Sequence, residues 1–249
     1  QYIPFNVNEV NMDFAILGNS TNTSATTPMM DVLLIAAKKD YIGQLRGAVD
    51  EAGLTVDVVD SQAFALGNVF EFNYGLQLRQ APSGMANVII DFGAGGTKLS
   101  VVEKDKTTFT RELRQSGISC TNAIAERLGL SFSEAEQRKI SDYESKEVGQ
   151  VIHDFCGTLA EEVGRTLDFY LSQSTEKTIE GVFTCGGASQ LYGLGEALEK
   201  KVPAPVKLLN PIQSIAGSGR KMNAKVIEEI KYLGAVAIGL SLRTTGDSK

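Results

Sequence analysis

The chain has 249 residues, of which 43% are hydrophobic and 22% charged, and its formal net charge is −6. This is the composition of an ordinary globular protein with one large domain or two smaller ones. No stripe of Lys or Arg offers a track for phosphates, which argues against nucleic acid as a partner, and the longest apolar run, residues 232–242, is too short to span a bilayer. A single His and three Cys without metal-type spacing argue against a transition-metal site and a His-based catalytic triad.

The first sixty residues are expected to form a small α/β unit. Apolar residues alternate over residues 10–17, as in a half-buried strand, and a loop rich in Ser, Thr and Asn follows. The apolar run 29–37 predicts a second strand. A helix over residues 40–52 and a third strand over 54–59 complete the unit.

The pattern of the remaining residues predicts an α/β fold that carries a block of helices. A helix over residues 61–72 precedes a meander of three strands with tight turns. Residues 118–173 are then expected to be helical, because apolar residues in their last part recur at helical spacing and form one buried stripe. After residue 178, strands and helices are expected to alternate. In order, the expected strands are 87–92, 97–103 and 107–113, the helices 118–128, 133–140 and 145–171, and the final elements 178–185, 189–200, 206–209 and 225–242.

The turn that follows the strand 87–92 has the residues of a phosphate-binding loop. Asp91 ends the strand, and Gly93, Gly95 and Gly96 allow backbone N–H groups to approach an anion. Thr97 is expected to donate its hydroxyl to a phosphate oxygen, and Asp91 to hold Mg²⁺ through water. The alternative is a plain glycine hairpin with a solvated Asp.

A second glycine turn follows the strand 178–185. Gly186 and Gly187 leave the backbone bare, and Ser189 is expected to cap the next helix, whose N-terminus favours a phosphate or a polar sugar edge. Taken alone, this is equally an ordinary strand-to-helix turn.

Two such loops about 90 residues apart resemble the second phosphate motif and the adenosine motif of the actin/Hsp70/sugar-kinase superfamily. Residues 232–240, rich in Gly and Ala, resemble its final connecting helix, where small residues allow close packing. Residues 61–66 resemble the earlier connecting helix, with Gln62 where the superfamily has a water-orienting residue. The resemblance implies an α/β, actin-like (ribonuclease H-like) ATPase fold that binds ATP with Mg²⁺.

Within that superfamily the chain resembles the PilM family, actin-like proteins of type IV pilus assembly related to FtsA. The matching segments are spread along the chain and are specific as a set: residues 2–5, 10–14, 59–66, the turn at Gly117 into 124–125, and 133–139.

The resemblance implies roles for further residues. Glu136 and Lys139 would flank the adenosine, although a solvated ion pair on an exposed helix face is the competing interpretation. Gly117 would form a turn beside the nucleotide.

The resemblance also implies a division into domains. Residues 1–58 would be an inserted FtsA-type subdomain of βαβ type, and residues 59–86 the remainder of a first lobe. Residues 87–249 would be a second lobe with a helical insertion at about 116–174.

The sequence departs from the family at its start, because it begins with Gln1 and lacks the first phosphate loop. We therefore expect a chain that carries the C-terminal part of the fold, with an incomplete nucleotide clamp and weak or no ATP hydrolysis.

The resemblance implies a cytoplasmic adaptor that is held at the inner membrane through its partners, without inserting into the membrane. The expected partners are the cytoplasmic tail of the inner-membrane protein PilN and other pilus assembly components, and a tail would dock by backbone pairing and side-chain pockets. Two alternatives remain. An FtsA-like filament protein would need a membrane-binding C-terminal helix, and a superfamily kinase would need a catalytic Asp.

Overall fold

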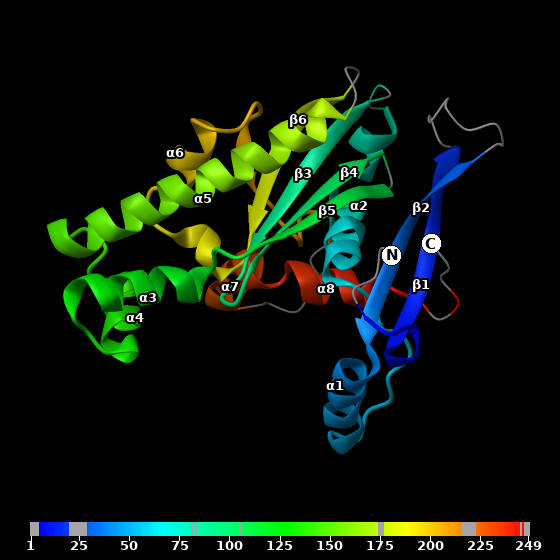
Figure 1. Cartoon of the computed structure of the whole chain (residues 1–249), viewed down its shortest axis with the longest axis horizontal. Helices are drawn as coiled ribbons and strands as arrows, with labels where there is room; N and C mark the ends of the chain where they lie inside the picture. Colours follow the sequence, from blue (N-terminus) through cyan, green and yellow to red (C-terminus); the bar gives the residue numbers. More distant parts are fainter. Residues whose placement is uncertain are drawn as a thin grey trace. The chain divides into compact units, whose positions relative to one another are not determined.

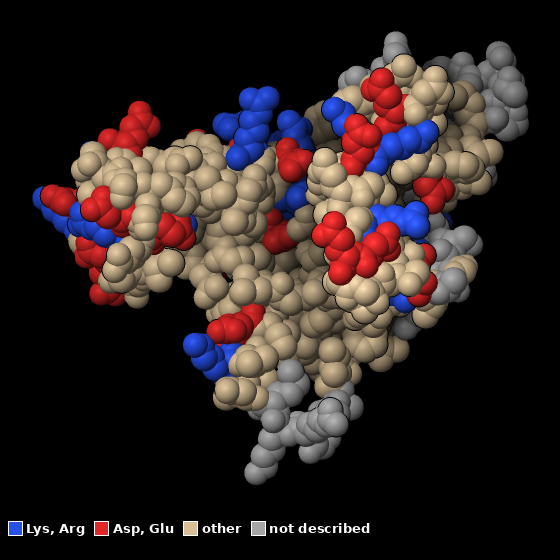
Figure 2. All heavy atoms as spheres, turned by 90° about the horizontal axis from the view of Figure 1, so that it is seen from below, with Lys and Arg blue, Asp and Glu red and all other residues tan. Residues whose placement is uncertain are grey.

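The computed structural model describes residues 5–19, 29–80, 82, 84–104, 106–173, 177–215, 223–244 and 246. The chain divides into two compact units, one of residues 1–60 with 243–249 and one of residues 61–242 (Figure 1). In the described part of the chain, none of the helices combines the length and the apolar character that crossing a bilayer requires. On the face drawn in Figure 2, basic side chains lie among acidic ones and form no stripe of one sign.

The first unit contains an antiparallel hairpin and a helix. After the short 3-10 helix Val7–Glu9, strand β1 (Val10–Asn19) pairs with β2 (Met30–Lys38), and α1 (Lys39–Glu51) follows directly. The two strands and the helix confirm the sequence-based prediction, but the loop expected between the strands lies almost entirely outside the described residues.

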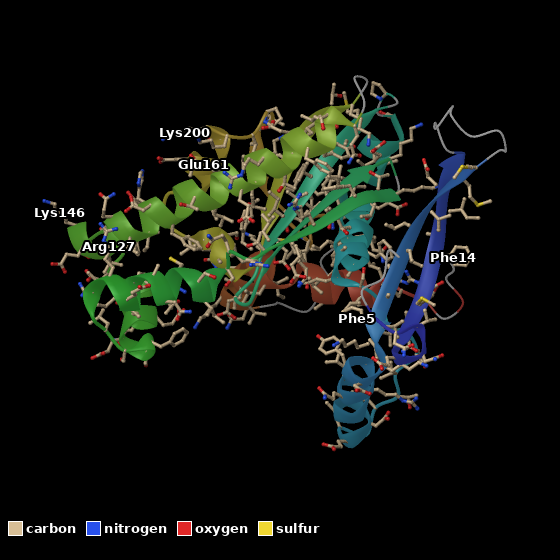
Figure 3. All side chains as sticks on the ribbon, viewed as in Figure 1. Phe5, Phe14, Arg127, Lys146, Glu161 and Lys200 are labelled. Carbon is tan, nitrogen blue, oxygen red and sulfur yellow. The ribbon has the colours of Figure 1, made fainter. Side chains whose placement is uncertain are left out.

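One face of the hairpin is apolar and exposed. Phe14 pairs with Leu34 and Ile16 with Val32, and the four side chains are between 44% and 62% exposed. Figure 3 shows the Phe14 ring standing off the ribbon of β1. In the same unit, Arg243 and Asp60 form an ion pair with an N···O distance of 3.2 Å.

The strand predicted over residues 54–59 is wrong, because residues 54–60 adopt neither helix nor strand. Leu54 and Val59 are 67% and 58% exposed. A strand exists through hydrogen bonds to a neighbouring strand, and among the described residues of this unit the sheet contains only β1 and β2, so residues 54–60 pair with neither.

The second unit is built on a five-stranded mixed sheet with the strand order β5-β4-β3-β6-β7. The expected meander is confirmed, with antiparallel pairing among its three strands, and β6 and β7 add in parallel. The strands are β3 (Met85–Phe92), β4 (Thr97–Glu103), β5 (Lys106–Leu113), β6 (Thr178–Cys185) and β7 (Val206–Leu208).

Helices cover both faces of this sheet, and the alternation of β3 residues shows the two layers. Val88 and Ile90 belong to one buried cluster with α3 (Gly117–Leu128), α5 (Lys146–Ser172) and α6 (Leu194–Glu199), whereas Ile89 belongs to another with α2 (Gln62–Gln80). The helix α4 (Phe132–Ser141) packs on α3 (Figure 1). Most helices agree with the prediction, but α2 extends eight residues beyond residue 72.

The last two predicted helices are each divided in two. Residues 189–200 form the 3-10 helix Gly187–Gln190 and α6. Ser189 therefore caps no helix, and its hydroxyl donates to the Gly186 carbonyl at 2.7 Å. Residues 225–242 form α7 (Ala224–Leu233) and α8 (Ala235–Ser241), with Gly234 between them.

Helix α8 packs closely on α2, as the small residues in its sequence predict. Gly239 faces the backbone of Ala65, and a Cβ at Gly239 would overlap the Ala65 carbonyl oxygen. The absence of a side chain at this position therefore sets the separation of the two helices.

We predict that Gly239→Ala lowers the free energy of unfolding by about 2–3 kcal/mol, because the added methyl group forces the helices apart. Gly157→Ala in α5 is the matched control. Its added methyl group meets no atom within 4 Å, so it should raise stability by roughly 0.5–1 kcal/mol. Urea denaturation measures both, and an unchanged or higher stability in Gly239→Ala would contradict this account.

Candidate functional site: a cavity between two glycine turns

The first glycine turn is fastened to the start of α3 by backbone hydrogen bonds. Within the turn, the Gly93 N–H donates to the Gly96 carbonyl at 3.0 Å. The N–H groups of Gly117 and Ile118 in turn donate to the carbonyls of Gly93 and Ala94 at 3.0 and 2.9 Å. The turn and the helix start therefore form one rigid piece of backbone.

The second turn lies beside Asp91 because β3 and β6 run in parallel, with Asp91 in register with Cys185. Gly186 follows with a φ of +85°, and a Cβ on it would collide with the Asp91 carboxylate and the Phe92 carbonyl. Only glycine fits this place without strain. The Gly186 N–H donates to the Tyr232 carbonyl at 2.9 Å, which ties the turn to α7.

Asp91 is 6% exposed, and its Oδ2 accepts a hydrogen bond from Gln62 Nε2 at 2.5 Å. Burial raises the pKa of the Asp91 carboxyl, and the Gln62 hydrogen bond and the charge of Lys98 only partly offset it. The residues expected to orient water and to hold magnesium are therefore brought together. In this structure the Gln62 amide is engaged by Asp91.

The donor set around Asp91 fits magnesium held through water. Among the described residues there is no group of three or more His, Cys, Asp and Glu side chains that would cage a metal ion. Mg²⁺ beside phosphates typically keeps several waters and uses only one or two carboxylates, so a single Asp next to a phosphate turn suffices. Bound magnesium would neutralise phosphate charge there.

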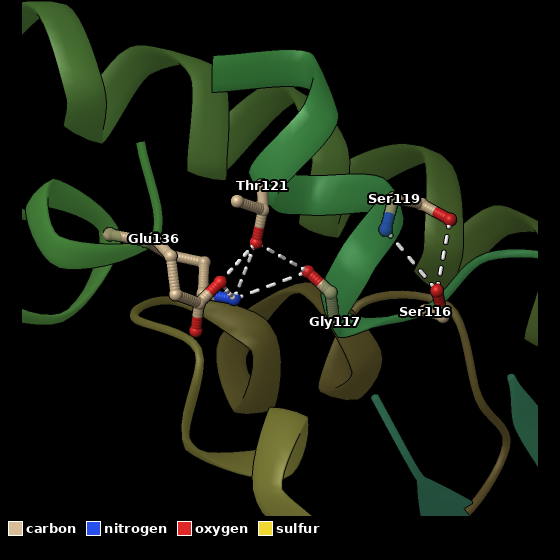
Figure 4. A network of polar contacts seen from close by, with 6 residues as sticks. Ser116, Gly117, Ser119, Thr121 and Glu136 are labelled. Carbon is tan, nitrogen blue, oxygen red and sulfur yellow. Dashed lines mark hydrogen bonds and ion pairs between the residues drawn. The ribbon is translucent and has the colours of Figure 1, made fainter. Parts of the chain in front are cut away.

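Glu136 and Lys139 form a partly buried network that joins α4 to α3 (Figure 4). Lys139 Nζ donates to Glu136 Oε2 at 2.7 Å, to Thr121 Oγ1 at 2.8 Å and to the Gly117 carbonyl at 3.2 Å. Thr121 also hydrogen-bonds Glu136. The Lys139 side chain is only 11% exposed and that of Glu136 is 39% exposed, so the pair is half-buried and not a fully solvated surface pair.

The pKa of Glu136 lies below its ordinary value. Burial raises it, but the hydrogen bonds from Lys139 and Thr121 and the charge of Lys139 outweigh burial. The carboxylate is thus held ionised at neutral pH by its two partners.

These groups line one cavity of about 1190 Å³. Its polar part contains Asp91, Gln62 and the backbone of both glycine turns. Its apolar part comes from the start of α3, from α4 and the segment after it, from the segment after the 3-10 helix that follows β6, and from the end of α7: Ile118, Phe132, Ile140, Tyr143, Leu191, Tyr192 and Leu233. The rings of Tyr143 and Tyr192 lie 5.3 Å apart at their centroids. Such a cavity fits a ligand with an anionic part and a planar apolar part.

Several expected binding residues lie outside the lining of this cavity. Gly95, Gly96, Thr97 and Ser189 are not among its lining residues. Thr97 is fully buried, and its hydroxyl donates to the Gln115 carbonyl at 2.7 Å, so it holds the turn and does not face a ligand. Gly93, Gly117, Gly186 and Gly187 do line the cavity, together with Asp91, Gln62, Glu136 and Lys139.

The sequence reasoning missed the aromatic residues of the cavity and Thr121. Tyr143 and Tyr192 follow the ends of α4 and of the 3-10 helix after β6. Exposed aromatic residues just past helix ends are the signal that would have found them. Thr121 lies one helical turn after Gly117 on the same helix face. The four-residue spacing between them is the signal that would have found Thr121.

Comparison with known proteins agrees with this architecture. The family described as Type IV pilus assembly protein PilM matches residues 1–245. A chain of a solved PilM–PilN type IV pilus biogenesis complex is 28% identical with a TM-score of 0.81, and the match covers 97% of this chain and 68% of that one.

More distant relatives share the fold. The cell division protein FtsA of Staphylococcus epidermidis is 24% identical over 207 residues, which are 74% of this chain and 43% of FtsA. The chain thus spans under half the length of this curated relative. MreB5 of Spiroplasma citri bound to AMPPNP has a TM-score of 0.55 at 14% identity, with coverage of 83% and 64%.

The sheet order, the two connecting helices and the pair of glycine turns define an actin-like ATPase fold. Within this class the family match is nearly complete. The chain belongs to the PilM family of type IV pilus assembly proteins.

We predict that Asp91→Asn raises the melting temperature at pH 7. The pKa of Asp91 is raised in the folded state, so its contribution to stability is present below the unfolded pKa and lost as pH rises through the folded pKa. The neutral amide of Asn avoids this loss of stability and can still accept the hydrogen bond from Gln62. The melting temperatures of the wild type and the variant, measured from pH 4 to 8, should converge at the acid end. A lower melting temperature in the variant at pH 7 would contradict the raised pKa of Asp91.

Proposed function

We propose that the cavity binds ATP with Mg²⁺ and that the intact protein is a nucleotide-responsive adaptor of type IV pilus assembly. The observation that carries the proposal is the convergence of Asp91 and two bare glycine turns on one cavity, which also has an aromatic part. The phosphates would lie against the Gly93 and Gly186 turns, and the base would lie near Tyr143 and Tyr192. The solved MreB5 structure bound to AMPPNP, which has the same fold, supports it.

We further propose that the adaptor binds the cytoplasmic tail of a PilN-like inner-membrane protein and is thereby held at the cytoplasmic side of the membrane. The similarity to a solved PilM–PilN complex over 97% of the chain supports this partner. In this view residues 1–58, which lie in the first compact unit, correspond to the inserted FtsA-type subdomain of the first lobe. Residues 59–86 would be the remainder of that lobe and residues 87–249 the second lobe.

The nucleotide proposal predicts that Asp91→Asn and Gly187→Leu weaken MgATP binding by the intact protein about tenfold or more. The first removes the charge that attracts Mg²⁺. The second places a side chain where Gly187 lines the cavity, and its Cβ alone would lie 3.3 Å from Leu233. Calorimetric titration measures both. Gly195→Leu, whose Cβ meets no atom within 4 Å, is the control, and wild-type affinity in both cavity variants would remove the assignment.

The partner proposal predicts that a synthetic peptide with the sequence of the PilN cytoplasmic tail binds the intact protein with one-to-one stoichiometry. A peptide of the same composition in scrambled order is the control, because backbone pairing with specific side-chain pockets depends on order. Calorimetry measures the binding. Equal affinity for both peptides, together with ATP-dependent filaments in a sedimentation assay, would favour the FtsA-like alternative.

A further inference from the structure

The Thr121 hydroxyl occupies the centre of the network between α3 and α4 (Figure 4). It is fully buried, accepts from Lys139 Nζ at 2.8 Å, and lies within hydrogen-bond distance of both the Gly117 carbonyl, at 3.0 Å, and Glu136 Oε2. A hydroxyl has a single proton to donate. Because a carboxylate is the stronger acceptor, the Thr121 hydroxyl donates its proton to Glu136. The Gly117 carbonyl accepts a hydrogen bond from Lys139 instead.

Lys139 has no proton left for a ligand. An ammonium group has three N–H donors, and the three acceptors within reach are Gly117 O, Thr121 Oγ1 and Glu136 Oε2. Its side chain is 11% exposed. A contact between Lys139 and a bound molecule would break one of these internal hydrogen bonds.

Glu136 is arranged differently. Both hydrogen bonds to its carboxylate go to Oε2, whereas Oε1 has no hydrogen-bond partner among the described residues. The side chain is 39% exposed and lines the cavity. An ionised carboxylate oxygen without an internal hydrogen bond can accept from a ligand, and sugar hydroxyl groups are suitable donors.

We propose that Thr121 is a positioning residue: its hydroxyl holds Glu136 Oε2, so that Oε1 accepts from the sugar hydroxyls of a nucleotide. Lys139 supports Glu136 and Gly117 from inside and does not contact the nucleotide. The inference deepens the proposed nucleotide function and rests on it for the identity of the ligand. It divides the Glu136–Lys139 pair into one ligand and one internal support.

The first test compares ATP with 2′,3′-dideoxyATP, which lacks both ribose hydroxyls. Thr121→Val keeps the shape of the side chain and removes the hydroxyl, so ATP should bind about tenfold more weakly. Binding of the dideoxy nucleotide should change less than twofold. Thr121→Ser restores the hydroxyl and should restore ATP affinity.

Thr166→Val is the matched control, because Thr166 is also buried in a helix and donates to the carbonyl four residues earlier, at 2.9 Å, without touching an ion pair. It should leave both affinities unchanged. If Thr121→Val weakened the binding of ATP and of the dideoxy nucleotide equally, the role of Thr121 would be merely structural, and this would overturn the proposal.

The second test asks whether Lys139 acts alone. In the Glu136→Gln background, Lys139→Met should cost less ATP affinity than it does in the wild-type background, because part of its effect acts through Glu136. An equal loss of ATP affinity in both backgrounds would make Lys139 a direct ligand and overturn the proposal.

A third measurement needs no nucleotide. The pKa of Glu136, followed by carbon NMR in the ligand-free protein, should rise in Thr121→Val and stay near the wild-type value in Thr121→Ser. A wild-type protein that binds no nucleotide would end the proposed function, while the Glu136 titration would still decide the positioning role. An unchanged Glu136 pKa in Thr121→Val would end that role even if ATP binds.

Discussion

The parallel pairing of β3 with β6 is the constraint on which the candidate site depends. It places Asp91 in register with Cys185, so the chain leaves both strands at the same edge and the two glycine turns meet there. The pairing leaves no room for a side chain on Gly186, because the Asp91 carboxylate occupies that space. A buried carboxylate, destabilised by its own burial, is thus fixed by backbone geometry at a place where a bound Mg²⁺ would offset the cost.

Gly117 links the two halves of the cavity. Its N–H donates to the first glycine turn, and its carbonyl accepts from Lys139, which also holds Glu136. The proposed nucleotide, if it moved Glu136, would therefore act on the same residue that fixes the first glycine turn. Figure 4 shows the part of this chain of hydrogen bonds that joins Gly117, Thr121 and Glu136.

The sequence predicted the parts of this structure that depend on local pattern. The meander, the long amphipathic α5 and the small residues of α8 follow from periodicity and from residue size. The two glycine turns follow from the strands that end at them. The strand expected at residues 54–59 failed because pairing partners are a tertiary property. The hydroxyl of Thr97 turned inward to Gln115 for a similar reason, since only the fold decides which acceptor lies near. Tyr143 and Tyr192 each follow a helix end, which a local pattern can mark, but their ring contact joins segments far apart in sequence and depends on the fold.

The central claim is that both glycine turns contact one bound nucleotide, and backbone amide NMR of the intact protein with saturating MgATP tests it most directly. The account predicts that the amides of the four glycines that line the cavity shift together along one binding curve: Gly93, Gly117, Gly186 and Gly187. Amides of α1, in the other compact unit, should provide the reference for unaffected backbone. Glycine amides that stay unmoved while MgATP binds with measurable affinity would contradict the account.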